Sequence, residues 1–201
     1  MKTKQILIAL LIFGGTTFSN AQKDTVADSR PFLERFYLEG HLGYFLFSDM
    51  SYVGLGFVIR PRHYLGFEYV PVLRSYSIST VNTAVDGWGM QYQYRVRKWY
   101  FSVSGGVMSK GYHITDDPFI VGPAERRTPF PYYRVAAKHC FWNFLCLGCQ
   151  IGACGPYKVV AYDETGNGYE WETGVRSLTI SLGFLLENSP NTLKKQWRKS
   201  N

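Results

Sequence analysis

Polar and ionisable residues recur at alternate positions within several apolar stretches of this 201-residue chain. Side chains two apart on a β-strand share one face, so these residues are expected to meet on a common surface. If that surface is enclosed, its acids must pair with its cations, because a buried unpaired charge is costly. The expected chemistry is a network of ion pairs and hydrogen bonds, serving as a plug or lining a narrow polar path. Its members are Glu39, His41, Glu68, Gln91, Gln93, Arg95, Arg134, Lys138 and Gln150.

The second group is a set of cysteines at 140, 146, 149 and 154, and the chain has no others. A turn centred on Asn143 would place Cys140 opposite Cys146 across a hairpin, with a Cβ separation of roughly 4.5–5.5 Å. A Cys140–Cys146 disulfide and four reduced thiols both remain open on these grounds. Cys146 and Cys149 point to opposite sides of a strand, so no metal site is predicted, and no cofactor is expected.

The elements that must position these residues are strands. Apolar residues alternate with glycine or polar residues in eight segments, which is the period of a strand. The segments lie at about 36–46, 52–59, 65–70, 88–96, 99–107, 132–138, 145–153 and 177–184. Short connections are expected at 48–50, 61–63, 97–98 and 141–143, and after the first hairpin they alternate with long ones near 73–86, 109–130 and 156–171. This order predicts an all-β fold, an eight-stranded antiparallel up-and-down transmembrane β-barrel.

Glycines on the mixed face indicate which side of the sheet meets water. A solvated strand face normally carries Lys, Glu or Thr, whereas glycine makes room inside a narrow barrel. The apolar face has no charge at mid-strand, as expected of a surface in contact with lipid. Tryptophans near strand ends fit two interfacial girdles. The girdle residues are Trp88, Trp99, Trp142 and Trp171, and the nine glycines are Gly43, Gly54, Gly56, Gly66, Gly89, Gly106, Gly148, Gly152 and Gly183.

The two ends of the chain differ from the barrel segments. Lys2 and Lys4, an apolar run at 6–13 and Ser19-Asn20-Ala21 predict a signal peptide over residues 1–21. We assign residues 22–33 to an N-terminal periplasmic segment, 34–186 to the barrel and 187–201 to a basic periplasmic tail. The signal peptide and the tail account for most of the formal charge of +7, so no concentrated basic face remains for nucleic acid.

Taken together, the signal ending in Ala21-Gln22, the eight segments and the alternation of connections resemble the small outer-membrane β-barrel family. That family includes OmpA transmembrane domains and the OmpX and OmpW types, and the resemblance covers residues 33–186. It implies the outer membrane of a diderm bacterium, periplasmic termini and a monomer that contacts outer-membrane lipids and the barrel-insertion machinery. The long loops would then face an extracellular partner, and the protein would be a non-enzymatic envelope or interaction protein with a plugged lumen.

Two alternatives remain. Lipid A palmitoyltransferases and deacylases share this architecture and place a His, a Ser and an acid at the outer rim. Here His113 lies near Ser109 and Thr115, but His113-Ile114-Thr115 only approaches the deacylase His-x-Ser pattern, so no catalytic residue is assigned. The other alternative is a soluble, secreted, lipocalin-like ligand-binding barrel, whose apolar face would point inward.

Overall fold

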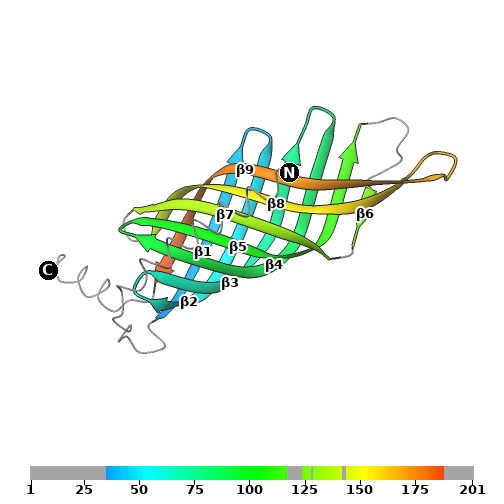
Figure 1. Cartoon of the computed structure of the whole chain (residues 1–201). Coiled ribbons are helices and arrows are strands. Elements are labelled where there is room, and N and C mark those ends of the chain that lie inside the picture. Colours follow the sequence, from blue (N-terminus) through cyan, green and yellow to red (C-terminus); the bar gives the residue numbers. More distant parts are fainter. Residues whose placement is uncertain (1–34, 117–123, 128, 142–143, 188–201) are drawn as a thin grey trace, which may run out of the picture.

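The computed structural model describes residues 35–116, 124–127, 129–141 and 144–187, and the regular elements in these ranges are β-strands (Figure 1). None of the described residues forms a helix long and apolar enough to cross a membrane. The proposed signal peptide, the N-terminal segment and the tail after residue 187 lie outside the described residues. The strands are β1 (Phe36–Phe45), β2 (Ser48–Arg60), β3 (His63–Tyr76), β4 (Thr80–Val96), β5 (Trp99–Thr115), β6 (Ala124–Arg126), β7 (Phe130–Phe141), β8 (Leu145–Tyr162) and β9 (Gly168–Glu187).

Eight long strands close into a ring, as the sequence predicts. Each strand pairs antiparallel with its neighbours in the order β1-β2-β3-β4-β5-β7-β8-β9. The ring closes where β1 meets β9, from Tyr37 opposite Glu187 to Tyr44 opposite Ile180. The three-residue β6 lies between the far ends of β5 and β8 and adds no wall of its own. The fold is therefore an eight-stranded antiparallel up-and-down barrel.

The connections expected to be long loops are mostly strand. β3 and β4 continue to a tight turn at residues 77–79, and β8 and β9 continue to a turn at 163–167. Alternation weakens there because the outward side chains are no longer uniformly apolar, although backbone pairing persists from Tyr157–Thr173 to Tyr162–Gly168. Figure 1 shows the β8–β9 hairpin, coloured yellow to orange, reaching beyond its neighbours. Glu187, which we assigned to the tail, is the last residue of β9.

The barrel has two distinct ends. The short-turn end carries the β2–β3 and β4–β5 turns, at residues 61–62 and 97–98, together with the start of β1 and the end of β9. The long-hairpin end carries the β3–β4 and β8–β9 turns and the β1–β2 turn at Leu46 and Phe47, so the connection expected at 48–50 is instead the start of β2. β1 has 10 residues while β9 has 20, so the wall is low at the β1–β2 hairpin and high at β8–β9.

The interior is stacked in three layers. At the short-turn end lies a mainly apolar cluster of Tyr37, Val58, Tyr64, Tyr100, Cys140, Cys146 and Leu185. A larger cluster fills the long-hairpin end, formed by Met50, Tyr52, Val70, Leu73, Ala84, Met108, Ala124, Phe130, Tyr132, Cys154, Tyr157, Val159, Ala161 and Val175. Between them is a layer of buried polar and charged side chains, which we call the polar belt. It comprises Glu39, His41, Glu68, Gln91, Gln93, Ser102, Arg134, Lys138, Gln150, Ser177, Thr179 and Ser181.

Glycines on the inner face let the large side chains fit. Gly89 and Gly106 face each other on β4 and β5; a Cβ on Gly89 would overlap the Tyr132 hydroxyl, and one on Gly106 would overlap the carbonyl oxygen of Trp88. Tyr37 lies over the facing pair Gly56 and Gly66, where a Cβ on Gly56 would stand 2.7 Å from its ring. The prediction that inner-face glycine makes room for bulky neighbours is confirmed at these positions.

Candidate functional site

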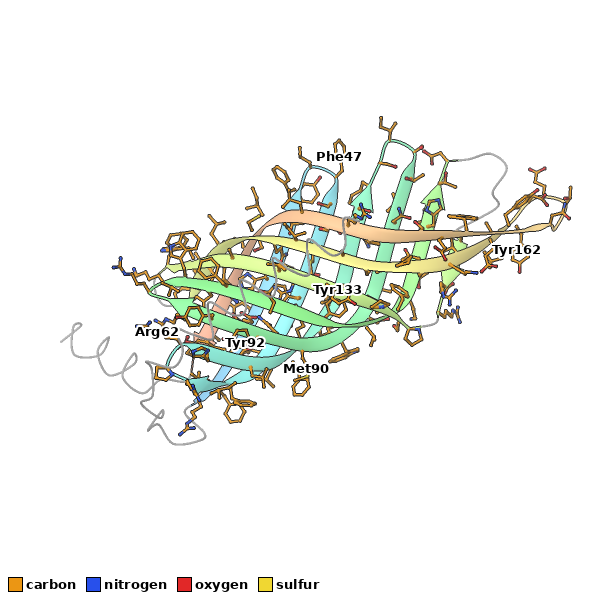
Figure 2. All side chains as sticks on the ribbon, viewed as in Figure 1. Phe47, Arg62, Met90, Tyr92, Tyr133 and Tyr162 are labelled. Carbon is orange, nitrogen blue, oxygen red and sulfur yellow. A yellow bond between two sulfur atoms is a disulfide. The ribbon has the colours of Figure 1, made fainter. Side chains whose placement is uncertain are left out.

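The outer surface of the barrel is apolar. The outward rows of all eight long strands carry exposed Leu, Val, Ile, Phe, Met or aromatic side chains, such as Leu42 at 75% and Leu182 at 56% exposure. Figure 2 shows Met90, Tyr92 and Tyr133 projecting from the wall. The charged residues of the polar belt, by contrast, are at most 2% exposed. This distribution is the reverse of that in a water-soluble barrel and confirms the face assignment made from the alternation.

Glu39 is the centre of one half of the polar belt. Its Oε1 accepts hydrogen bonds from Gln91 Nε2 at 2.6 Å and Gln93 Nε2 at 3.1 Å. Its Oε2 accepts one from Lys138 Nζ. The three donors come from β4 and β7, so this carboxylate ties β1 to two strands elsewhere in the ring. Charge-assisted hydrogen bonds of this kind are the strong ones.

Glu68 is the centre of the other half. Tyr132 donates from its hydroxyl to Glu68 Oε1 at 2.7 Å, and Arg134 donates to Oε2. The Arg134 guanidinium also lies 3.6 Å from the ring centroid of Tyr52, a cation–π contact. Both acids of the belt are thus matched by its two cations. Tyr52 and Tyr132 were not among the predicted network residues. Their position on the inner face of the alternation was the sequence feature that could have identified them.

His41 and Gln150 also lie inside, as predicted. His41 stacks on Tyr52 with ring centroids 5.0 Å apart, and its Nε2 is 3.9 Å from Glu39 Oε2. Gln150 donates from Nε2 to the carbonyl oxygen of Met50 at 3.1 Å. Both side chains belong to the polar belt.

The structure does not bring Arg95 into the belt. Arg95 NH1 is 3.3 Å from Glu187 Oε2 at the short-turn end, and its side chain is 39% exposed. Tyr64 and Tyr100 also donate to Glu187, at 2.7 and 2.8 Å. Arg95 therefore joins a separate cluster that closes the short-turn end, because it lies only two residues before the turn at 97–98. Glu187 could not be found as its partner while it was assigned to the tail.

The predicted girdle tryptophans do not share one environment. Trp88 and Trp99 face outward with 61% and 47% exposure. Trp142 lies outside the described residues. Trp171 is instead partly buried against the apolar cluster at the long-hairpin end. Trp171 lies four residues before Val175 on β9 and therefore faces inward with it. Our assignment of Trp171 to an outer girdle was wrong.

Among the cysteines, the structure joins Cys140 and Cys146 in a disulfide across the β7–β8 hairpin. These residues face each other directly and lie in the apolar cluster at the short-turn end. Cys149 is exposed on the outer face and Cys154 is buried, both as thiols.

His113 is held by an amide at the long-hairpin end. Its Nδ1 lies 2.6 Å from Asn82 Oδ1, which also accepts a hydrogen bond from Thr173 at 3.2 Å. The imidazole packs edge-on against Trp171, with centroids 5.3 Å apart. This setting fixes the orientation of the imidazole within the barrel mouth.

Comparison with known proteins finds similarity in fold. No family model matches the chain, and no curated protein matches it in sequence. The N-terminal β-barrel domain of Pseudomonas aeruginosa OprF is 13% identical, covering 76% of this chain and 98% of that one, with a TM-score of 0.41. OprG from the same organism is 4% identical, covering 76% and 96%, with a TM-score of 0.46. A major outer membrane protein from Thermus thermophilus is 11% identical, covering 75% and 99%, with a TM-score of 0.44.

The closed antiparallel ring and its outward apolar rows decide the architecture. The chain has the fold of a small outer-membrane β-barrel. Strands of about 9–11 residues suffice to cross the hydrocarbon region in such folds, and each of the eight wall strands has at least 10.

Proposed function

We propose that this protein is an integral outer-membrane barrel with a filled interior, acting as a non-enzymatic envelope or interaction protein. The observation that carries the proposal is the distribution of side chains. Apolar residues cover the outside of every wall strand, while two ion pairs and their hydrogen-bond partners are buried inside. A charge facing lipid at mid-membrane costs roughly 2–4 kcal/mol, so such a surface suits a bilayer.

The plugged lumen is supported by the three interior layers. The polar belt lies between two largely apolar clusters, which a hydrated path would have to cross. Glu39 and Glu68 are neutralised by Lys138 and Arg134, leaving the belt without net formal charge. Eight-stranded barrels are just wide enough for side chains to fill them.

The interaction role is supported by the strand extensions. β4, β5, β8 and β9 have 17 to 20 residues, well beyond the roughly 9–11 needed to cross the bilayer. The excess at the long-hairpin end carries ion pairs, including Lys158–Glu170 at 3.3 Å and Lys110–Asp86 at 3.5 Å. This extended wall, which also exposes Val160 and Tyr162, would project from the cell as a surface for an extracellular partner. The short turns and both termini would then be periplasmic, and the barrel would be a monomer assembled by the insertion machinery.

Envelope fractionation combined with electrophoresis before and after boiling tests the proposal. We expect an outer-membrane band whose mobility changes on heating. Leu182→Arg should reduce that folded band, while Leu182→Phe should not, because only the former puts a charge toward lipid. Extraction without detergent would indicate a soluble barrel, and a change in lipid A mass that depends on the protein would indicate an enzyme.

Orientation and conductance need separate measurements. An epitope inserted at Thr165 in the β8–β9 turn should be reached by antibody on intact cells, and one inserted at Lys98 should not. Purified barrel in planar bilayers should lack steady porin-like conductance. Reversed labelling would overturn the topology, and large stable channels would overturn the plug.

A further inference from the structure

The disulfide between Cys140 and Cys146 lies inside the barrel. The two cysteines are directly opposite each other on β7 and β8, and the bond joins them across the hairpin. Cys140 is 6% exposed and Cys146 is 0% exposed. Thiol–disulfide exchange requires an attacking thiolate to contact a sulfur atom. In the folded barrel, the bond is therefore closed to thiol and disulfide reagents.

The cover over this disulfide comes from strands other than β7 and β8. The two cysteines share the apolar cluster at the short-turn end with one side chain from each of β1, β2, β3, β5 and β9, namely Tyr37, Val58, Tyr64, Tyr100 and Leu185. Tyr37 and Leu185 belong to the two strands that meet where the ring closes. The cover is therefore complete only in the closed ring, whereas a β7–β8 hairpin by itself leaves both sulfur atoms accessible.

The end of β9 also fastens this cover. Glu187, the last residue of β9, accepts hydrogen bonds from the hydroxyls of Tyr64 at 2.7 Å and Tyr100 at 2.8 Å. Both tyrosines belong to the cover, and they come from β3 and β5. Because β9 is the last wall strand in the chain, these contacts form only when the whole barrel has been assembled.

Strand pairing decides which cysteines can bond. Cys146 and Cys149 are nearer to each other in the sequence than the bonded pair is, so an unpaired chain would oxidise to a mixture. In the β7–β8 hairpin, Cys149 lies opposite Ala137, and Cys154 lies opposite Tyr132. The observed disulfide therefore requires that the hairpin has formed, and its burial requires that the bond is made before the ring closes.

We propose that a disulfide-bonded dithiol protein of the periplasm oxidises Cys140 and Cys146 in this interval, between hairpin formation and ring closure. The proposal rests on the outer-membrane function proposed above, which takes the chain through an oxidising compartment. One cysteine thiolate attacks the carrier's disulfide, which forms a mixed disulfide and releases one carrier thiolate. The other cysteine thiolate then attacks the barrel sulfur of the mixed disulfide and releases the second carrier thiolate. Two electrons pass from the cysteine pair to the carrier, which leaves as a dithiol after taking up the two protons that the cysteines lost.

The order of oxidation and folding can be tested with the full mature protein. Reduced protein is refolded into detergent micelles, and oxidised glutathione is added either at the start or after the folded gel band has formed. Alkylation of free thiols and peptide mass spectrometry then measure the Cys140–Cys146 bond. We expect bond formation to be at least about a hundredfold slower in the folded barrel, because exchange must wait for the ring to open. Equal rates would overturn the proposal, whereas a reduced chain that cannot fold would support it, since oxidation would then have to come first.

A matched control places a cysteine pair across an exposed turn. Ser77→Cys/Thr80→Cys is made in a chain that also carries Cys140→Ser and Cys146→Ser. The amide of Ser77 donates to the carbonyl of Thr80 at 2.8 Å, and Ser77 is exposed at the β3–β4 turn. This pair should oxidise at similar rates before and after folding. An equal slowing in the control would mean that the micelle blocks the reagent, and would overturn the explanation by ring closure.

Cells test the nature of the oxidant. In cells that lack their periplasmic dithiol oxidase, newly made protein that is quenched with acid and alkylated should form the bond at least about tenfold more slowly. An unchanged rate would overturn the assignment of a dithiol protein as partner. A folded, heat-modifiable barrel that oxidises freely after folding refutes this inference alone, whereas a protein extracted without detergent refutes the membrane function.

Discussion

Replacing Glu39 by Gln should lower the free energy of unfolding of the barrel, because it breaks a buried ion pair. The substitution keeps the shape of the side chain but removes the charge that Lys138 Nζ contacts. Lys138, only 1% exposed, then lies in an interior that also holds Arg134 and retains one acid, Glu68. The amide donors of Gln91 and Gln93 would face an uncharged acceptor.

The expected loss follows from burial. Breaking a fully buried ion pair by removing one partner costs about 3–5 kcal/mol. That corresponds to roughly two to nearly four powers of ten in the unfolding equilibrium. The double variant Glu39→Gln/Lys138→Met removes both charges, so it should stay within about 1–2 kcal/mol of wild type. Glu187→Gln, which breaks a partly exposed pair with Arg95, should cost only about 1 kcal/mol.

Urea unfolding of the protein folded into phospholipid vesicles measures these differences, with tryptophan fluorescence and gel mobility as independent probes. The reasoning fails if Glu39→Gln loses less than about 1 kcal/mol, since a buried lysine without its partner cannot be that well tolerated. It also fails if the loss of stability in Glu39→Gln/Lys138→Met equals the sum of the losses in Glu39→Gln and in Lys138→Met, because the two residues would then not be coupled.

Three further outcomes are expected. Gly106→Ala should destabilise the barrel by about 1–3 kcal/mol in the same unfolding assay, whereas Gly105→Ala should be nearly neutral, because its Cβ would meet Tyr133 at an ordinary 3.5 Å. Thiol labelling of denatured, unreduced protein should find two reactive cysteines, Cys149 and Cys154, while four would rule out the disulfide. Hydrogen bonds from Thr165, Asn167 and Tyr169 hold the pKa of Asp163 well below its usual value. The β8–β9 turn should therefore be fully stabilised above about pH 4 and loosen as the pH falls toward the lowered pKa. Protection factors of the turn amides, which are corrected for the pH dependence of intrinsic exchange, should fall with the pH, and this fall should be absent in Asp163→Ala. Protection factors insensitive to acid in the wild type would contradict this.

The alternation of side chains was enough to predict the eight strands, their antiparallel order and the face that each residue within the eight predicted segments occupies; Trp171, outside those segments, was assigned to the wrong face. A strand has a period of two, so assigning one residue such as Glu39 to the interior also assigns its neighbours at 37 and 41. Inner-face glycines were equally informative, because glycine weakens a strand and is therefore uncommon on a strand face exposed to water. The opposition of Cys140 and Cys146 followed from hairpin geometry, although whether they bond could not be read from spacing.

Only the closed ring of strands determines which inward side chains contact one another across the barrel. Glu39 meets Lys138 from 99 residues away, and Glu68 meets Arg134 from 66 away, because strand tilt and stagger set which inward side chains share a level. The alternation shows which face of the sheet a residue occupies but not its position along the barrel axis. Arg95 was therefore grouped with the polar belt although it lies at the short-turn end. The extended hairpins were missed for a related reason. Beyond the bilayer the outward residues need not be apolar, so the period-two signal fades while backbone pairing alone carries β8 and β9 onward.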